Sequence, residues 1–276
     1  MCYRFSNNQE EKEFREHMRS IGKVFKHTSE EKQGKFSFFY SNGFDHESLP
    51  VITMEKPDEI SHMNWGYITR KAKSHEQKVE IWKKGSTLNA RSEEIFSTWS
   101  YKDSIWDRRC LIPATGFFES RDIGDKLKYP YLVQVIDDKE HDVAGTFCMA
   151  GIYDFWIDKE NGGELVESFS IITCQGNSMM KKVHVNLKRE DLGGRMPLIL
   201  HESSYNNWLN PDINENDIKD LMQPFPEKEM FAYTVHQDVN RTKNRTVIPD
   251  INSPLTLNHI AYDKLGEETA FNLPFC

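Results

Sequence analysis

The chain has 276 residues, of which 38% are hydrophobic and 28% are charged, a composition typical of a globular protein. No run of about eighteen apolar residues occurs and residues 1–15 are polar, so we expect a cytoplasmic protein without membrane association. The formal net charge of −8 argues against a protein that coats nucleic acid nonspecifically. Any nucleic-acid site must therefore be a local basic patch on an acidic body.

We expect no disulfide framework, no metal and no organic cofactor. The cysteines are odd in number, widely spaced and without a C-x-x-C pair, which indicates reduced thiols. Ten histidines are present, and none is paired with another at the spacing of metal ligands. The five cysteines are Cys2, Cys110, Cys148, Cys174 and Cys276.

The first third of the chain predicts one short helix followed by strands. Phe14 and Met18 lie four residues apart among charged residues, which indicates a helix over 10–18 that covers an edge of the core. Aromatic and β-branched runs, interrupted by Ser, Asn, Gly or Pro, indicate strands. The densely charged run 70–84 is typical of a solvated helix or loop. The predicted strands are 36–40, 49–53 and 63–68.

A second helix is expected after residue 91. Ser92 is a favoured helix cap, and the two glutamates that follow it suit a first turn, so the helix should run from Ser92 to Trp99. Asn89 and Arg91 would then lie in the loop just before this helix. In such a loop, polar side chains can face a ligand.

The remainder of the chain predicts more strands and two short helical segments. A helical turn over 177–184 would bring His184 to the end of a sheet, and a helix passes through Tyr205 and Trp208. No internal repeat, linker or break in composition divides the chain, so we expect one domain of mixed α+β type. The predicted strands are 108–119, 131–136, 144–155, 168–174, 193–200 and 231–235.

Cys2 stands directly behind the initiator methionine and is the first candidate for chemistry. Its small side chain favours removal of Met1, which would leave an α-amine with pKa near ~8 beside a thiol with pKa near ~8.5. Such a 1,2-aminothiol condenses with an aldehyde to an imine, and attack by the sulfur then closes a thiazolidine ring. The alternative is that the thiol only packs in the interior, as free cysteines often do.

Glu119 is the second candidate, because it follows a glycine and two phenylalanines at the end of an apolar strand. A carboxylate placed against so much aromatic surface is partly desolvated, which raises its pKa toward the range useful to a general acid. The alternative, that Glu119 marks the point where the strand leaves the core for water, stays open at this stage.

Several motifs, in this order, resemble the SRAP (SOS response-associated peptidase) family, also called abasic-site processing proteins. The resemblance covers most of the chain to about residue 209, and a weaker similarity continues over 235–240. No single motif is specific for the family, but the occurrence of these motifs in this order is. The motifs are Met1-Cys2-x-Arg4-Phe5, Trp65-Gly66, Asn89-Ala90-Arg91-x-Glu93, Arg109-Cys110-Leu111-Ile112-Pro113-Ala114-x-Gly116-Phe117-Phe118-Glu119, Pro130-Tyr131, Ala150-Gly151-Ile152, Ile171-Ile172-Thr173 and Arg195-Met196-Pro197-Leu198-Ile199-Leu200.

The resemblance implies a protein of the DNA damage response that links its N-terminal cysteine covalently to the ring-opened sugar of an abasic site in single-stranded DNA. It implies a single SRAP-like domain over 2–276, with mainly antiparallel sheets in a barrel-like core and a few flanking helices. The motifs are strongest over 2–209, and 210–276 would be the C-terminal part of the same domain. We expect a monomer.

The family's functional positions carry over one by one. Cys2 becomes the nucleophile, whose amine attacks the C1′ aldehyde. Glu119 would protonate the departing ring oxygen, His184 would shuttle protons, and Asn89 would accept from the amine and orient it. The positions that match phosphate-contacting residues are Arg4, Arg91 and Arg195.

Trp65 or Tyr67 would stack against a base or wedge beside the gap left by the missing one. A role for these two aromatic residues in the core stays open as the alternative.

Three departures from the family pattern concern the site. Tyr3 replaces the usual glycine and narrows the room near the nucleophile, and Ser120 replaces a tryptophan. The family's histidine usually stands a few residues before the Arg-Met-Pro segment, whereas here residues 185–194 separate His184 from Arg195. His184 is nevertheless the nearest histidine on the N-terminal side.

Two other functions stay open beside DNA capture. A cysteine-dependent peptidase or amidohydrolase would use Cys2, His184 and Asn89 as nucleophile, base and oxyanion-stabilising group. A plain single-stranded DNA-binding module would have no use for the aminothiol. Within the first hypothesis, β-elimination from the imine would add an abasic-site lyase activity, and Met1 removal would be a minimal self-processing step.

Overall fold

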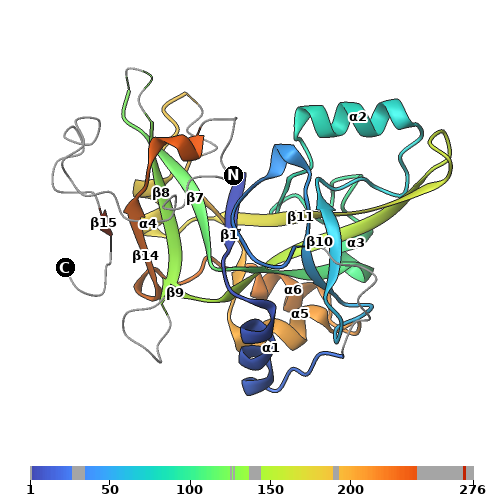
Figure 1. Ribbon diagram of the computed structural model, residues 1–276, viewed down its shortest axis with the longest axis horizontal. Helices are drawn as coiled ribbons and strands as arrows, with labels where there is room; N and C mark the ends of the chain where they lie inside the picture. Colours follow the sequence, from blue (N-terminus) through green and yellow to red (C-terminus); the bar gives the residue numbers. More distant parts are fainter. Residues whose placement is uncertain are drawn as a thin grey trace.

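Two β-sheets lie side by side in the computed structural model, with most of the helices around them (Figure 1). The fold class is the expected α+β. Among the residues described, no helix is long and apolar enough to cross a bilayer. The structure describes residues 2–26, 35–124, 126, 128–136, 144–188, 193–240 and 270–271.

The first sheet is antiparallel and holds the N-terminal strand in its interior. Strand β1 pairs with β7 on one side and with β2 on the other, so its backbone is bonded along both edges. The order is β15 (Ala270–Phe271), β14 (Met230–Thr234), β8 (Lys128–Ile136), β7 (Gly116–Asp122), β1 (Arg4–Asn7) and β2 (Phe38–Asn42), with β9 (Ala144–Gly145) beside β8.

The second sheet closes on itself. Strand β10 pairs with both β6 and β11, and the path from β11 through β4, β3 and β6 returns to β10, which makes a five-stranded barrel. The β4–β11 pair is parallel and the other pairs are antiparallel, so the barrel is mixed. The expected barrel-like core is confirmed. The strands are β3 (Ser48–Thr53), β4 (Ser61–Trp65), β6 (Arg109–Ala114), β10 (Phe147–Asp158) and β11 (Glu164–Gln175), with β5 (Asn89–Arg91), β12 (Arg195–Pro197) and β13 (Ile199–Leu200) paired to them.

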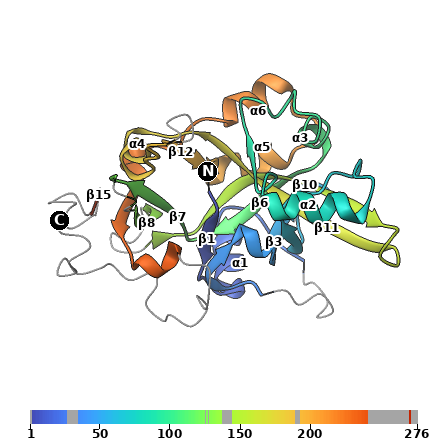
Figure 2. The same cartoon turned by 90° about the horizontal axis from the view of Figure 1, so that it is seen from above.

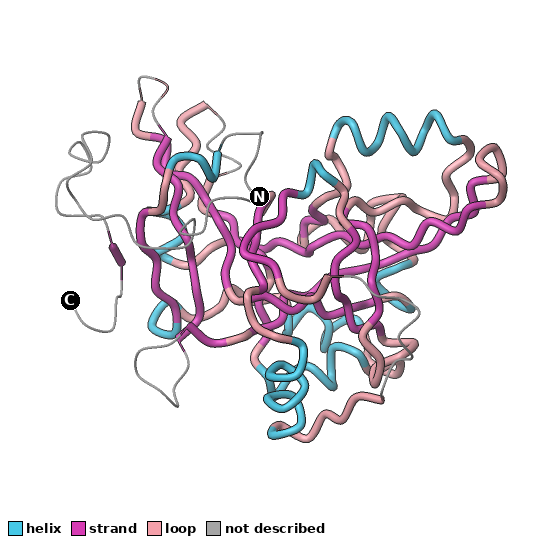
Figure 3. Tube along the Cα trace, in the orientation of Figure 1, coloured by secondary structure: helices cyan, strands magenta, loops and turns pink. Residues whose placement is uncertain are grey.

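The helices are short and lie mainly outside the sheets (Figure 3). Helix α1 (Glu11–Ser20) forms where the charged run with Phe14 and Met18 predicts it, and it buries these two side chains. Helix α2 (His75–Lys84) lies in the charged run, where Ser74 caps it through the Gln77 amide. The other α-helices are α3 (Ser104–Asp107), α4 (Ser178–Val183), α5 (Tyr205–Leu209) and α6 (Glu215–Leu221), and the 3-10 turns are Gly43–Asp45, Glu202–Ser204, Glu227–Glu229 and Gln237–Asn240.

The helix expected from Ser92 is wrong, because this segment forms a series of turns and the next helix is α3. The Ser92 amide donates to the Thr173 carbonyl and so continues the pairing of β5 with β11. Further along, the hydroxyls of Ser97 and Thr98 both donate to the Glu94 carbonyl, a local bonding pattern that competes with a regular helix. Asn89 and Arg91 therefore lie on a strand and not in a loop.

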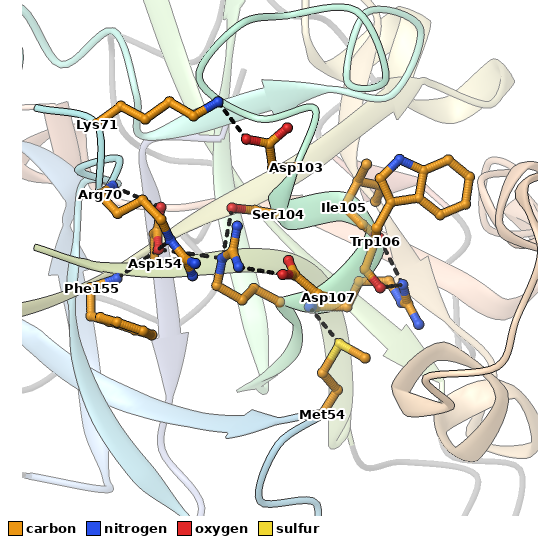
Figure 4. A network of polar contacts seen from close by, with 12 residues as sticks. Met54, Arg70, Lys71, Asp103, Ser104, Ile105, Trp106, Asp107, Asp154 and Phe155 are labelled. Atoms are coloured by element: carbon orange, nitrogen blue, oxygen red, sulfur yellow. Dashed lines mark hydrogen bonds and ion pairs between the residues drawn. The ribbon is translucent and has the colours of Figure 1, made fainter.

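A buried ionic network fastens the segment that leaves β5 to the barrel (Figure 4). Asp154, on β10, is 1% exposed and accepts from the backbone and side chain of Arg70 at 2.8 and 2.9 Å. Arg108 lies 3.3 Å from the same carboxylate, and Lys71 pairs with Asp103 just before α3. These pairs satisfy the buried charge and join three chain segments.

Arg109 is a fully buried cation and anchors α3 and α5 to β6. Its side chain is fully buried, and its guanidinium donates to the carbonyls of Trp208, Ile105, Trp106 and Asn210 at 2.6–2.8 Å. Burial lowers the pKa of Arg109 to about 10, so the group is still charged at neutral pH. The planar fork matches this set of acceptors in a way that an ammonium cannot.

Arg109→Lys is therefore expected to lower the free energy of unfolding by about 3 kcal/mol or more, because several buried carbonyls lose their donor. Urea unfolding followed by circular dichroism measures it. Arg19→Lys, an exposed position on α1, is the matched control and should change little. Equal stability of the two variants would contradict the anchoring role.

Candidate functional site

Cys2 lies two residues before β1, and Figure 2 shows β1 between β7 on one side and the barrel strands β3 and β6 on the other. Cys2 is fully buried, and its thiol faces the Arg4 carbonyl at 3.6 Å. Burial, and then the nearby Glu119 carboxylate, raise the pKa of the Cys2 thiol well above its usual range. The thiol is therefore protonated at neutral pH.

Glu119 lies within β7, which continues beyond it to Asp122. Phe5 pairs with Phe117, and continuing this antiparallel register places Tyr3 opposite Glu119. Glu119 is only 7% exposed, so the alternative that it leaves the core for water is wrong. The strand pairing thus brings a buried carboxyl beside the start of the chain.

Asn89 reaches the same place from the barrel. Its strand, β5, runs parallel to β11, with Asn89 opposite Ile171. The Asn89 Nδ2 donates to the Cys2 carbonyl at 2.8 Å. Its Oδ1 is buried and accepts no hydrogen bond from the described residues. Asn89 therefore holds the backbone of Cys2 and keeps one buried acceptor beside it.

His184 ends α4 and lies against Glu119. Its Nδ1 is 2.9 Å from the Arg195 carbonyl, which requires a proton on Nδ1, and its Nε2 is 3.5 Å from Glu119 Oε2. A ring with its proton on Nδ1 presents the Nε2 lone pair to the carboxyl. The geometry therefore suits transfer of a proton between Glu119 and His184.

The ten-residue separation of His184 from Arg195 does not move the histidine away. The Gly194 amide donates to the His184 carbonyl at 2.7 Å, and the Gly176 amide donates to the Gly194 carbonyl at 2.6 Å. A Cβ on Gly176 would overlap that carbonyl oxygen, so glycine is required there. His184 and Gly194, on either side of the extra residues, are therefore bonded to each other; 189–192 lie outside the described residues.

The three predicted phosphate-binding arginines lie in different surroundings. Arg91 and Arg195 flank the end of β11, where they pair with Thr173 and Gln175. The Arg91 side chain is 34% exposed and lies 3.5 Å from Glu94.

Arg195 is less exposed than Arg91, whereas Arg4 and Arg91 are both half-buried. Arg195 is nearly buried, and its guanidinium makes paired hydrogen bonds of 2.9 and 3.0 Å to Glu93. Arg4 is half-buried, and its Nε has no hydrogen-bond partner within the described part of the chain.

Trp65 does not lie at the site surface. It is fully buried, its indole nitrogen donates to the Leu88 carbonyl, and its ring packs against Phe5 and Phe169. No ring face is left for a base, because each is covered by the core. Tyr67 is buried as well. Neither ring is exposed for stacking against a base. The burial of Trp65 and Tyr67 agrees with the alternative, a role for both residues in the core.

Glu93 is a site residue to which the sequence assigned no role, although it stands in the motif Asn89-Ala90-Arg91-x-Glu93. Burial alone would raise the pKa of Glu93, but the hydrogen bonds and charge of Arg195 outweigh it and hold the pKa below its usual value. The pair therefore contributes stability above about pH 4.3, the usual glutamate value, and loses it as the pH falls through the lowered pKa.

Glu93→Gln is expected to lower the free energy of unfolding at pH 7 by about 1 kcal/mol, a modest value because Glu93 is 43% exposed. The difference from the unsubstituted protein should shrink as the pH falls through the lowered pKa of Glu93, because protonation of the carboxyl removes its charge. Urea midpoints over this fall in pH measure it. Glu94→Gln, at the more exposed neighbour, should show neither effect, and a difference that persists at low pH would refute the ionic explanation.

Comparisons with known proteins agree with this architecture. Residues 1–242 match the family model described as SOS response associated peptidase (SRAP), and the chain belongs to this family. It is 27% identical over 215 residues to the abasic site processing protein YoqW of Bacillus subtilis, an alignment that covers 78% of this chain and 86% of that protein.

Two further comparisons extend the similarity. The abasic site processing protein HMCES of Xenopus tropicalis is 29% identical over 200 residues, which are 68% of this chain and 55% of that protein. A crystal structure of a protein from Bacteroides thetaiotaomicron matches with a TM-score of 0.77 at 32% identity, over 92% of this chain and all of the other.

Proposed function

We propose that this protein captures abasic sites in single-stranded DNA through a covalent thiazolidine at Cys2, after removal of Met1. The observation that carries the proposal is the convergence on Cys2 of three side chains from three distant segments. Asn89 bonds its backbone, Glu119 lies beside it, and His184 lies against Glu119.

The reaction proceeds in two condensations. The α-amine of Cys2 adds to the C1′ aldehyde of the ring-opened sugar, and the carbinolamine loses water to form an imine. The thiol then adds across the C=N bond: sulfur bonds to carbon, and the thiol proton passes to nitrogen. The product is the aldehyde plus the protein minus one water, with no oxidation or reduction.

The residues around Cys2 suit these steps. The buried Oδ1 of Asn89 is an acceptor for the amine, and its Nδ2 already holds the adjacent carbonyl. Glu119 and His184 supply and remove protons at the sugar ring oxygen and at the carbinolamine. The phosphates on either side of the abasic site would be bound by Arg4, Arg91 and Arg195. These arginines supply the positive charge for DNA in a protein whose net charge is negative.

The raised pKa of the Cys2 thiol favours this route over a cysteine peptidase. A peptidase needs a thiolate as its first nucleophile, and burial disfavours a thiolate here. Imine formation begins instead from the amine and uses the thiol second, in its neutral form. β-Elimination from the imine, a lyase reaction, is the competing fate of the same intermediate.

The test is incubation of the purified protein, with Met1 shown to be absent by intact mass, with a single-stranded oligonucleotide that bears one abasic site. We expect a heat-stable adduct on a denaturing gel, a mass equal to the sum of the two components minus one water, and a peptide map that places it at residue 2. An oligonucleotide with a tetrahydrofuran analogue has no aldehyde and should form none. An adduct on a lysine instead would refute the proposal.

A further inference from the structure

Tyr3, the residue that departs from the family's usual glycine, is held in a fixed position next to the reactive cysteine. Its carbonyl accepts from the Gly43 amide at 2.9 Å, and its ring packs on Phe44 with centroids 5.4 Å apart and planes tilted by 35°. Gly43 and Phe44 belong to the 3-10 turn that follows β2. Backbone and side chain of Tyr3 are therefore both fixed by this turn.

Phe44 is itself supported from behind. A Cβ on Gly85, the residue that ends α2, would overlap the Phe44 ring, so ring and backbone are in close contact there. The outer side of Phe44 stays open, since 47% of the residue is exposed. Tyr3 and Phe44 thus form a two-ring wall that stands on α2 and reaches the surface beside Cys2.

Tyr3 lies close to the other residues of the proposed site. The β1–β7 register places Tyr3 opposite Glu119. Burial, the Glu119 carboxylate and Cys2 raise the pKa of Tyr3, whereas Arg91 opposes them. Tyr3 therefore lies within electrostatic range of the nucleophile, the carboxyl and one of the phosphate-binding cations.

We infer that Tyr3, backed by Phe44, covers the reaction centre, contacts the bound abasic sugar and shields the adduct from water. This inference rests on the proposed function. Tyr3 directly follows Cys2 in the chain, so a sugar bound at Cys2 lies next to the residue that carries this ring. The wall is a feature of this chain that a glycine at position 3 cannot supply.

Release of the DNA needs water at the carbon that the wall covers. The C–S bond breaks, the nitrogen lone pair forms the C=N bond, and the proton on nitrogen returns to sulfur. Water then adds to the imine carbon and the amine leaves, which regenerates aldehyde and aminothiol. A ring packed over that carbon slows the addition by excluding water.

The experiment compares adduct lifetimes. Adducts of the unsubstituted protein, Tyr3→Phe and Tyr3→Gly are isolated and treated with excess hydroxylamine, which displaces the Cys2 amine from the imine and leaves an oxime on the sugar. Loss of adduct is followed on denaturing gels. We expect Tyr3→Gly to lose its adduct about tenfold faster, a barrier change near 1.4 kcal/mol, and Tyr3→Phe to differ by less than about twofold.

Phe44→Ala provides an independent test, because an exposed ring is removed without touching β1. Phe44→Ala should also shorten the lifetime of the adduct, whereas Phe39→Ala should not. Phe39 is likewise an exposed phenylalanine, but it lies on β2. Equal adduct lifetimes for Tyr3→Gly, Phe44→Ala and the unsubstituted protein would refute the shielding role of the wall. A Tyr3→Phe adduct as short-lived as that of Tyr3→Gly would also refute it. Failure of the unsubstituted protein to form any adduct would overturn the proposed function instead.

Discussion

Cys2→Ala and Cys2→Ser are both expected to abolish the heat-stable DNA adduct, and each should leave an imine that borohydride traps. Alanine keeps the α-amine but has no side-chain nucleophile, so its imine hydrolyses during denaturation. Serine keeps the amine and adds a hydroxyl, whose ring product is less stable than a thiazolidine. Both variants are measured by denaturing gel, with and without borohydride, on the same abasic oligonucleotide.

Cys148→Ala is the matched control for the two Cys2 variants. Cys148 is also a buried free cysteine, but it lies on β10, where its backbone bonds to the Tyr205 hydroxyl. It should form the adduct normally once folding is confirmed. A heat-stable adduct in Cys2→Ala would show that another residue is the nucleophile. Normal DNA binding without adduct in the unsubstituted protein would favour the plain binding module.

Glu119→Gln is expected to slow adduct formation by about a hundredfold or more, the usual contribution of a positioned general acid. The same substitution should make the Cys2 thiol react faster with iodoacetamide, because the Glu119 charge is one cause of its raised pKa. The two effects have opposite signs. Unfolding would also expose the fully buried Cys2 to iodoacetamide, so the pair of effects is diagnostic once circular dichroism shows that Glu119→Gln is folded.

Both rates are measured on the same preparation between pH 7 and 9. Glu80→Gln, on the exposed surface of α2 and paired with Lys84, is the control and should change neither rate. Adduct formation at the normal rate in Glu119→Gln would exclude it as the acid. Slower alkylation would show that its charge does not act on the thiol.

The strands were predictable from the sequence because their periodicity is strong. The aromatic runs, the apolar strand through Glu119 and the segment before His184 all form regular structure close to where the pattern places them. The Ser92 segment was mispredicted because its backbone pairs with β11, residues that are distant in the chain. Capping preferences describe only how neighbouring residues favour a helix. Here pairing with a distant strand and local hydrogen bonds from hydroxyl groups outweigh that preference.

The convergence of the site residues could be expected only through the family resemblance. Spacing alone does not tell that Asn89 bonds the Cys2 carbonyl or that His184 lies against Glu119. A sequence also does not show that Trp65 is buried in the core, since an aromatic residue next to glycine fits both a core role and a base-stacking role. The partner of Arg195 was hidden for a similar reason: Glu93 looked like part of a helix.

The position of β1 has a consequence for timing. Ser6 bonds to Gly116, which lies 110 residues further along the chain, and Asn89 bonds to Cys2 across 87 residues. During synthesis the Cys2 end therefore emerges long before the residues that surround it in the folded protein. Methionine aminopeptidase has access to the free end during that interval, and cellular aldehydes meet only an unassisted amine. Under the proposed function, folding is the step that gives this end group its reactivity.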